Sequence, residues 1–240
     1  MAAQSRGRFI TLEGGEGAGK STNLRAIIEY LKERGVPHIS TREPGGTALA
    51  EALRAVLLNP KSEIAPMSEL LMVFAARFDH VEKVIVPALK AGTWVICDRF
   101  VDASFAYQGG GRGLPVKKIE ALERWLPRLA KPDLTLLLDV SPKRGLTRAT
   151  RGRAADRFER EKAEFYQKVR EAYLARARSA NRYCIVDAGR SRKAVGVQVL
   201  SAIGALVDRY HKSAPKPSHK PARGSQRDAV KGATSRRTRS

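Results

Sequence analysis

The sequence predicts a three-layer α/β fold, in which helices cover both faces of a five-stranded parallel sheet. Short runs rich in β-branched and aromatic residues alternate with longer segments of helical periodicity throughout residues 1–210. The first short run leads into a glycine-rich turn that is followed at once by a helical pattern. With 240 residues, of which 42% are hydrophobic and 29% charged, the chain has an ordinary globular composition and the length of one large domain or two small ones.

Five short apolar segments are predicted as strands: residues 8–13, 37–41, 93–98, 134–140 and 183–187. Right-handed crossovers bring the carboxyl ends of parallel strands to one edge of the sheet, where ligands bind. Seven segments are predicted as helices: residues 20–34, 48–58, 67–90, 116–129, 142–150, 157–180 and 192–210. The apolar face predicted for the longest helix consists of Leu71, Phe74, Phe78, Val81 and Ile85.

Several protein classes are excluded by composition. No apolar run reaches the roughly 18–20 residues that a membrane-spanning helix needs, and residues 1–8 contain no apolar stretch of the signal-peptide type. Cys97 and Cys184 are too few for a disulfide framework or a four-cysteine zinc site, and both lie in predicted strands. We therefore expect a protein of the reducing cytoplasm.

The basic charge is spread over two regions. The formal net charge is +21, and residues 211–240 account for +8 of it with nine basic residues and one acid, Asp228. This last segment is rich in Pro, Ser, Lys and Arg, so we predict a disordered basic tail after a single domain of residues 1–210. A tail of this kind either binds a polyanion, such as nucleic acid or acidic lipid, or is a solvated extension. The remaining charge favours anionic partners, which include nucleotides and nucleic acids.

The turn after the first strand matches the phosphate-binding pattern G-x-x-x-x-G-K-[ST] between a strand and a helix. Its residues are Gly14, Gly15, Glu16, Gly17, Ala18, Gly19, Lys20 and Ser21, followed by Thr22. The glycines let successive backbone N–H groups point at phosphate oxygens, and the start of the helix adds a positive dipole end. Lys20 supplies positive charge to the β- and γ-phosphates, and Ser21 a hydroxyl to Mg²⁺. The segment predicts a P-loop that binds a nucleoside triphosphate.

Asp98 ends a predicted apolar strand, where a carboxylate can hold Mg²⁺ directly or through water. The alternative is a helix N-cap. Arg99 beside it favours the metal role, because the pair places a metal ligand next to a group that can fork around a phosphate. The guanine-recognition motif N/T-K-x-D is absent from the later strands, which disfavours a regulatory GTPase.

These features, with five sequence segments, resemble the thymidylate kinases, the P-loop nucleoside monophosphate kinases that phosphorylate dTMP. The segments are residues 13–22, 41–47, 74–89, 98–113 and 148–159. The resemblance covers nearly all of residues 1–210 and implies that MgATP and dTMP react to give ADP and dTDP. Because the acceptor phosphate is already largely dianionic at pH 7, the reaction needs positioning and charge neutralisation rather than a strong general base.

The resemblance also implies roles for acceptor-side residues. Phe74 stacks on the base, although its place in the apolar stripe equally allows a core role. Arg77 and Arg99 hold the acceptor phosphate, and Arg42 assists them unless it forms a surface ion pair. Pro44 belongs, with Glu43 and Gly45, to a shaped turn lining the acceptor site. All of these residues lie in the segments named above.

The nucleoside is expected to meet a second group of residues. By resemblance, Ser104 and Gln108 contact the pyrimidine edge, Tyr107 packs against C2′ of the sugar, and Glu16 contacts the 3′-hydroxyl. Residues 109–111 are three glycines, for which we predict a loop with positive φ around the ligand. Without the resemblance, the same segment is a mobile surface loop. A methyl group contributes only about 1–3 kcal/mol, so dUMP is expected to be a poor substrate rather than none.

Two positions depart from the family pattern. Gly17 stands where some members have arginine, and members without it resemble a subtype in which a lid supplies the catalytic arginine. The lid, near residues 148–159, contains Arg148, Arg151, Arg153 and Arg157, and the catalytic one is either Arg153 or Arg151. Phe100 stands where Tyr or His is expected, which removes a polar contact.

Other functions remain open at the level of the sequence. The nearest alternative is a kinase for another nucleoside monophosphate or for a deoxynucleoside. A P-loop switch or a nucleic-acid-binding ATPase would use the basic tail but would not need the segment at residues 106–113. A homodimer is expected from the resemblance alone, formed through the helix of residues 67–90.

Overall fold

The computed structural model describes residues 6–149 and 156–213. Five parallel strands form one sheet in the order β2-β3-β1-β4-β5. Their bounds are β1 Phe9–Glu13, β2 His38–Arg42, β3 Trp94–Asp98, β4 Leu134–Asp139 and β5 Tyr183–Asp187. Each strand lies within one residue of its predicted position, and the predicted parallel sheet is confirmed.

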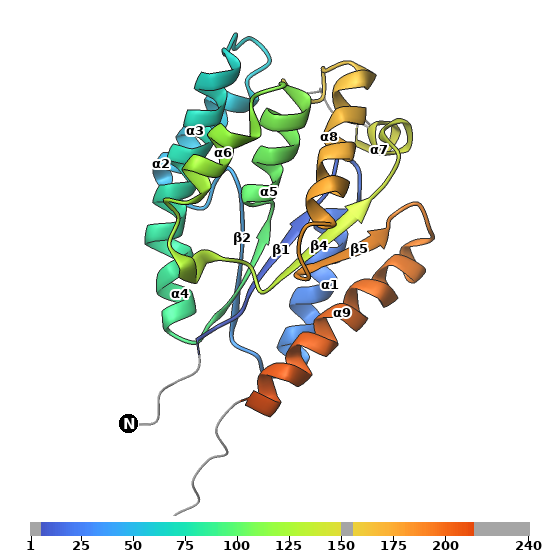
Figure 1. Cartoon of the computed structure of the whole chain (residues 1–240). Coiled ribbons are helices and arrows are strands. Elements are labelled where there is room, and N and C mark those ends of the chain that lie inside the picture. Colours follow the sequence, from blue (N-terminus) through green and yellow to red (C-terminus); the bar gives the residue numbers. More distant parts are fainter. Residues whose placement is uncertain (1–5, 150–155, 214–240) are drawn as a thin grey trace, which may run out of the picture.

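Helices cover both faces of this sheet (Figure 1). One face is covered by α1 (Lys20–Glu33) and α9 (Arg192–Ser213), which pack together and against the central strands. The helical elements of the other face and of the cavity rim are α2 (Ala48–Leu58), α3 (Pro66–His80), η1 (Val81–Ile85), α4 (Val86–Lys90), α5 (Val101–Ser104), η2 (Phe105–Gly111), α6 (Val116–Glu123), η3 (Arg128–Ala130), α7 (Pro142–Ala149) and α8 (Ala163–Ala177).

Successive side chains of a strand point to opposite faces of the sheet, so the core has one part on each face. Ile10 and Leu12 of β1 pack on the α1–α9 side, whereas Phe9 packs on the other side with residues of α3, α4 and α5. Every residue of β1 is buried, as expected for a central strand of a sheet covered on both faces. Packing on both faces of the sheet therefore holds β1 in place, and with it the turn that follows β1.

The most important correction concerns residues 109–111, which were expected to form a loop with positive φ within the segment of residues 101–111. This segment forms α5 and η2, and none of Gly109, Gly110 and Gly111 has positive φ. The glycines serve instead for close packing: a Cβ on Gly110 would lie 2.7 Å from both Ala172 Cβ and the Lys168 carbonyl oxygen of α8. Tertiary contact with α8 thus overrides the low helix propensity of glycine.

Smaller differences affect helix bounds and faces. Residues 66–90 are helical throughout, but residues 81–85 have π-helical bonding, and Leu71 is 48% exposed rather than part of the buried face. The helix expected over 157–180 begins only at Ala163. The segment expected over 116–129 is divided into α6 and η3, with Pro127 between them.

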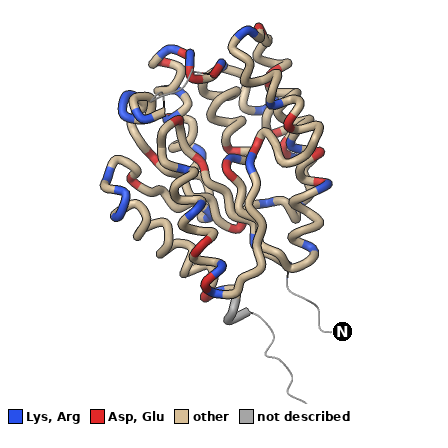
Figure 2. The backbone as a smooth tube through the Cα atoms, turned by 180° about the vertical axis from the view of Figure 1, so that it is seen from behind, with Lys and Arg blue, Asp and Glu red and all other residues tan. Residues whose placement is uncertain are grey.

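Charged positions are interspersed over the described elements rather than confined to one of them (Figure 2). No described helix is long and apolar enough to cross a membrane. The predicted tail from residue 214 onward lies outside the described residues, and α9 extends three residues beyond its predicted end.

Candidate active site

A cavity of about 720 Å³ opens at the carboxyl edge of the sheet. The P-loop, the end of β3, α3 and the α5–η2 segment all contribute to its wall. Of the residues predicted from the sequence, the wall includes Glu16, Gly17, Ala18, Gly19, Lys20, Ser21, Thr22, Pro44, Arg77, Asp98, Arg99, Ser104, Tyr107, Gln108 and Arg148. The structure therefore brings residues from four distant segments into one cavity of the size of a small-molecule site.

The P-loop has the backbone that its sequence predicts. Gly14, Gly17 and Gly19 have φ values of 136°, 64° and 92°, a region that only glycine enters without strain. Lys20 begins α1 and is 8% exposed, and its Nζ donates to the carbonyl oxygens of Gly14 (3.2 Å) and Gly15 (3.1 Å). Burial lowers the pKa of Lys20, and the positive charge of Arg99 lowers it further.

Gly17 lies directly against the helix that precedes the lid segment. A Cβ on Gly17 would lie 2.0 Å from the Gly145 carbonyl oxygen of α7, and a Cβ on Gly145 would lie 2.3 Å from the Glu16 carbonyl oxygen. These two glycines let the P-loop and α7 meet backbone to backbone. A side chain at position 17, as in family members with arginine there, does not fit this arrangement.

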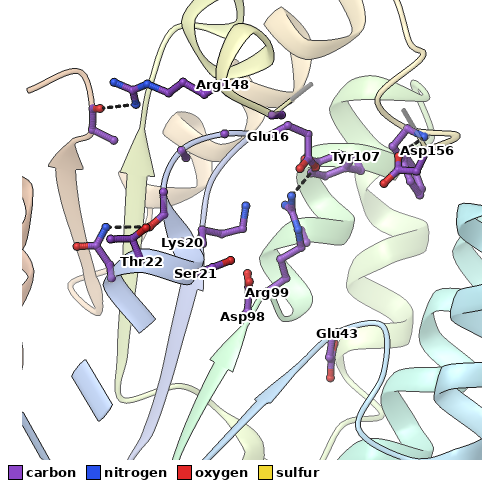
Figure 3. Close-up of a pocket in the computed structure, with 18 of the residues that line it drawn as sticks. Glu16, Lys20, Ser21, Thr22, Glu43, Asp98, Arg99, Tyr107, Arg148 and Asp156 are labelled. Atoms are coloured by element: carbon purple, nitrogen blue, oxygen red, sulfur yellow. Dashed lines mark hydrogen bonds and ion pairs between the residues drawn. The ribbon is translucent and has the colours of Figure 1, made fainter. Parts of the chain in front are cut away.

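Ser21 and Asp98 face the same space as Lys20 (Figure 3). Asp98 Oδ1 is buried without a hydrogen-bond partner among the described residues. A buried carboxylate oxygen in this state needs a cation or a polar ligand. One carboxylate and one hydroxyl beside a phosphate site are a donor set that suits Mg²⁺, which takes its other ligands from phosphates and water.

Arg99 has φ 70°, the only positive φ among the described residues other than glycine. Its Nη2 donates to Glu16 Oε1 at 2.6 Å, and its Nη1 to the Gly14 carbonyl oxygen at 3.0 Å and to Tyr173 Oη at 3.2 Å. Tyr107 Oη also donates to Glu16 Oε1, at 2.9 Å. These contacts place the Arg99 guanidinium and the Glu16 carboxylate together beside the P-loop, as Figure 3 shows.

Glu13, the last residue of β1, holds the turn that contains Arg99. Glu13 is fully buried and accepts hydrogen bonds from Phe100 N (2.7 Å) and Tyr173 Oη (2.8 Å). Burial, with the negative charge of Asp102 nearby, raises the pKa of Glu13 to about 8. Sequence analysis gave Glu13 no role, because its contacts with Phe100 and Tyr173 join residues 87 and 160 positions apart.

Arg77 is 1% exposed and is held on three sides. Its Nε donates to Glu43 Oε2 at 2.6 Å, its Nη1 to Ser104 Oγ at 2.9 Å and its Nη2 to the Phe100 carbonyl oxygen at 3.0 Å. Since a guanidinium has five N–H groups, two remain for a ligand. His80 Nδ1 lies 3.1 Å from the other oxygen of Glu43.

Two residues expected on the acceptor side do not line the cavity. Phe74 is 1% exposed and packs in the core with its ring 4.6 Å from the Arg77 guanidinium carbon. Arg42 pairs with Glu51 on the surface, at 3.0 Å. These contacts correspond to the core role and the surface ion pair that the sequence left open, and the acceptor roles of both residues stay predictions. Arg151 and Arg153 lie outside the described residues.

Other cavity residues gave no signal in the sequence. They include Asn23, Arg54, Asp156, Arg190 and Arg192. Arg54 donates to the Pro44 carbonyl oxygen at 2.9 Å and so supports the turn of residues 41–47. Among the expected lid arginines, Arg148 lines the cavity and donates to the Ala188 carbonyl oxygen at 3.1 Å, whereas Arg157 donates to Glu69 at 2.7 Å.

Comparison with known proteins agrees with this geometry. A family model described as thymidylate kinase matches residues 12–199. The chain belongs to the thymidylate kinase family. A thymidylate kinase of Nitrosospira multiformis is 52% identical over 202 residues, which are 84% of this chain and 98% of that protein. One of Neisseria gonorrhoeae is 52% identical over 185 residues, which are 77% of this chain and 90% of that protein.

A solved thymidylate kinase has the same fold. The crystal structure of thymidylate kinase from Ehrlichia chaffeensis is 32% identical and has a TM-score of 0.66, covering 84% of this chain and 99% of that one. The resemblance to thymidylate kinases predicted from the P-loop and four further segments is thereby confirmed. Membership of this family argues against the alternatives of a P-loop switch and of a nucleic-acid-binding ATPase.

Proposed function

We propose that this chain transfers the γ-phosphoryl group of MgATP to dTMP, giving ADP and dTDP for dTTP synthesis. The observation that supports the proposal best is that one cavity has a P-loop on one side and Arg77, Ser104 and Gln108 on the other. A phosphate donor and a nucleotide acceptor can therefore meet end to end. The family to which the chain belongs has the same activity in its name.

The donor side consists of the P-loop, residues 14–22. Backbone N–H groups of the loop and the start of α1 bind the phosphates, and Lys20 exchanges its two carbonyl partners for phosphate oxygens. Ser21 and Asp98 hold Mg²⁺, which neutralises charge on the phosphates when it is bound. The orphaned Asp98 Oδ1 gives this assignment its structural support.

The acceptor side consists of Arg99, Arg77, Glu16 and Tyr107, with Pro44 in the wall. Arg99 lies between the P-loop and Tyr107, so it can contact the acceptor phosphate as that phosphate approaches the donor. Glu16 and Tyr107 are joined by a hydrogen bond and face the sugar, where the ring limits space at C2′. Fixed cations around the transferring group lower the barrier by charge stabilisation, without a general base.

Closure of the site belongs to the segment of residues 148–159. We propose that Arg153 or Arg151 completes the charge around the phosphoryl group, and that closure excludes water. The kinase domain, predicted to end at residue 210, continues to the end of α9 at Ser213, and we propose that the residues after it are a separate basic tail. We propose that two chains associate through the helix of residues 66–90, where Leu71 is 48% exposed. Sedimentation tests this interface, because Leu71→Glu should sediment as a monomer.

The central experiment measures ADP release from ATP and magnesium with dTMP, dUMP, dCMP and purine monophosphates. We expect dTMP to be the best acceptor and dUMP a poor one. Lys20→Ala should lower turnover by at least about 100-fold while the protein stays folded, and Lys32→Ala, which changes an exposed lysine of the same helix, should not. Absence of dTMP-stimulated ADP release from the wild type refutes the proposal.

A further inference from the structure

Glu69 of α3 is a fully buried carboxylate to which sequence analysis gave no role. Its Oε2 accepts from Arg157 Nη2 at 2.7 Å and from Arg112 Nε at 3.2 Å. Its Oε1 accepts from Gln108 Nε2 at 2.8 Å and, at the longer distance of 3.3 Å, from Arg112 Nε. Two guanidinium groups compensate the negative charge, so the carboxylate is stable in the interior and can only accept hydrogen bonds.

This arrangement fixes which way the amide of Gln108 faces. The two ends of a glutamine amide have nearly the same shape but opposite hydrogen-bonding character. Because Glu69 only accepts, the NH₂ group of Gln108 must face it. The side-chain oxygen of Gln108, Oε1, has no hydrogen-bond partner among the described residues, and Gln108 lines the cavity. The polar atom that Gln108 can offer a ligand is therefore an acceptor.

An acceptor at this position distinguishes two classes of pyrimidine. Thymine and uracil have an N3–H group, which donates. Cytosine has an unprotonated N3, which accepts and would oppose the Gln108 oxygen. Two buried acceptors that face each other without a proton repel each other, and neither regains the hydrogen bond that it made to water. Polar mismatches of this kind give strong discrimination in enzyme sites.

We propose that Glu69 is a specificity-determining positioning residue: it locks the Gln108 amide so that the cavity selects pyrimidine nucleotides with an N3–H group and rejects cytosine nucleotides. The proposal rests on the proposed function, because it assigns Gln108 to the base of the acceptor. Glu69 itself touches no substrate. Its effect on the substrate is exerted through the hydrogen bond that Gln108 Nε2 donates to Glu69 Oε1.

Glu69→Gln is an informative variant because the arginines dictate its orientation. Arg157 and Arg112 need an acceptor, so the new amide turns its oxygen toward them and its NH₂ group toward Gln108. Gln108 then turns its own oxygen toward residue 69 and presents NH₂ to the cavity. The cavity now offers a donor, which suits N3 of cytosine and opposes N3–H of thymine.

The test compares kcat/KM for dTMP and dCMP in the wild type and in Glu69→Gln, with folding checked by circular dichroism. We expect kcat/KM for dTMP to fall and that for dCMP to rise, so that the dTMP preference drops about 10- to 100-fold, with the KM for ATP unchanged. Arg112→Met removes another partner of Glu69 but keeps its bond to Gln108, so its dTMP preference should equal that of the wild type.

Several outcomes overturn the inference. If Glu69→Gln loses dTMP and dCMP activity in equal proportion, Glu69 is structural only; if Arg112→Met lowers the preference as much, the Gln108 bond is not the cause. Should Glu69→Gln not fold, Glu69→Gln with Arg112→Met restores the local charge balance and must show the same drop in dTMP preference. A wild type without dTMP kinase activity refutes the proposed function, whereas an active wild type with an unchanged preference in the variant refutes only this inference.

Discussion

The ion pair between Glu43 and Arg77 provides a strong test of how this cavity is built. Both side chains are at most 2% exposed and are joined at 2.6 Å. In Glu43→Ala, the Arg77 guanidinium stays buried without its counter-charge, and His80 Nδ1 loses its acceptor. Breaking a buried pair by removing one partner costs about 3–5 kcal/mol, so we expect the free energy of unfolding to fall by that amount.

The measurement is equilibrium unfolding in urea without nucleotide. At a slope of about 2 kcal/mol per M, the midpoint should move down by about 1.5–2.5 M. Removing both charges, in Glu43→Ala with Arg77→Met, should recover more than half of the loss, because no unpaired ion is then buried.

An exposed pair in the same turn is the matched control. The side chains of Arg42 and Glu51 are 56% and 43% exposed, so Arg42→Ala should cost less than about 1 kcal/mol. If Glu43→Ala is no more destabilising than Arg42→Ala, the pair is not what holds Arg77 in place, and the reasoning is wrong.

Three further perturbations follow from the structure. Gly110→Val places atoms against the backbone of α8 and should cost about 1–3 kcal/mol of stability, whereas Gly196→Ala in α9 meets no atom within 4 Å and should not destabilise the protein. For Glu13, the unfolded chain loses its proton near pH 4.5 and the folded protein near pH 8. Stability should therefore fall as pH rises through that window, by at most about 1.4 kcal/mol per unit, and Glu13→Gln should flatten the fall; an identical pH slope in the variant counts against the raised pKa. Chelation of magnesium by EDTA should abolish ADP release but leave the circular dichroism spectrum unchanged, and full turnover in EDTA would refute the metal role of Ser21 and Asp98.

Local sequence patterns were sufficient to predict the sheet and the phosphate-binding loop. Strand ends followed from apolar runs, and the P-loop from residues contiguous in sequence, so β1, its turn and α1 could be placed without any knowledge of tertiary contacts. Asp98 and Arg99 were found for the same reason, since the carboxyl end of a parallel strand is a predictable location.

The parts that sequence analysis missed depend on contacts between distant residues. Glu69 meets Gln108 39 positions away, and Glu43 meets Arg77 34 positions away. No local periodicity predicts such pairs. The helical segment of residues 101–111 was missed because three glycines argue against a helix, and only the surface of α8 makes their missing side chains an advantage.

The contact of Gly17 with Gly145 has a consequence for how such enzymes can diverge. With the two backbones touching, an arginine cannot be introduced into the loop one substitution at a time unless α7 has already moved away. Since α7 ends at Ala149, directly before the predicted lid segment in the sequence, a change at position 17 must also move α7. The residue at position 17 and the position of α7 must therefore change together in evolution. A chimera that takes only the P-loop from a relative with arginine at this position should be inactive until α7 is exchanged too.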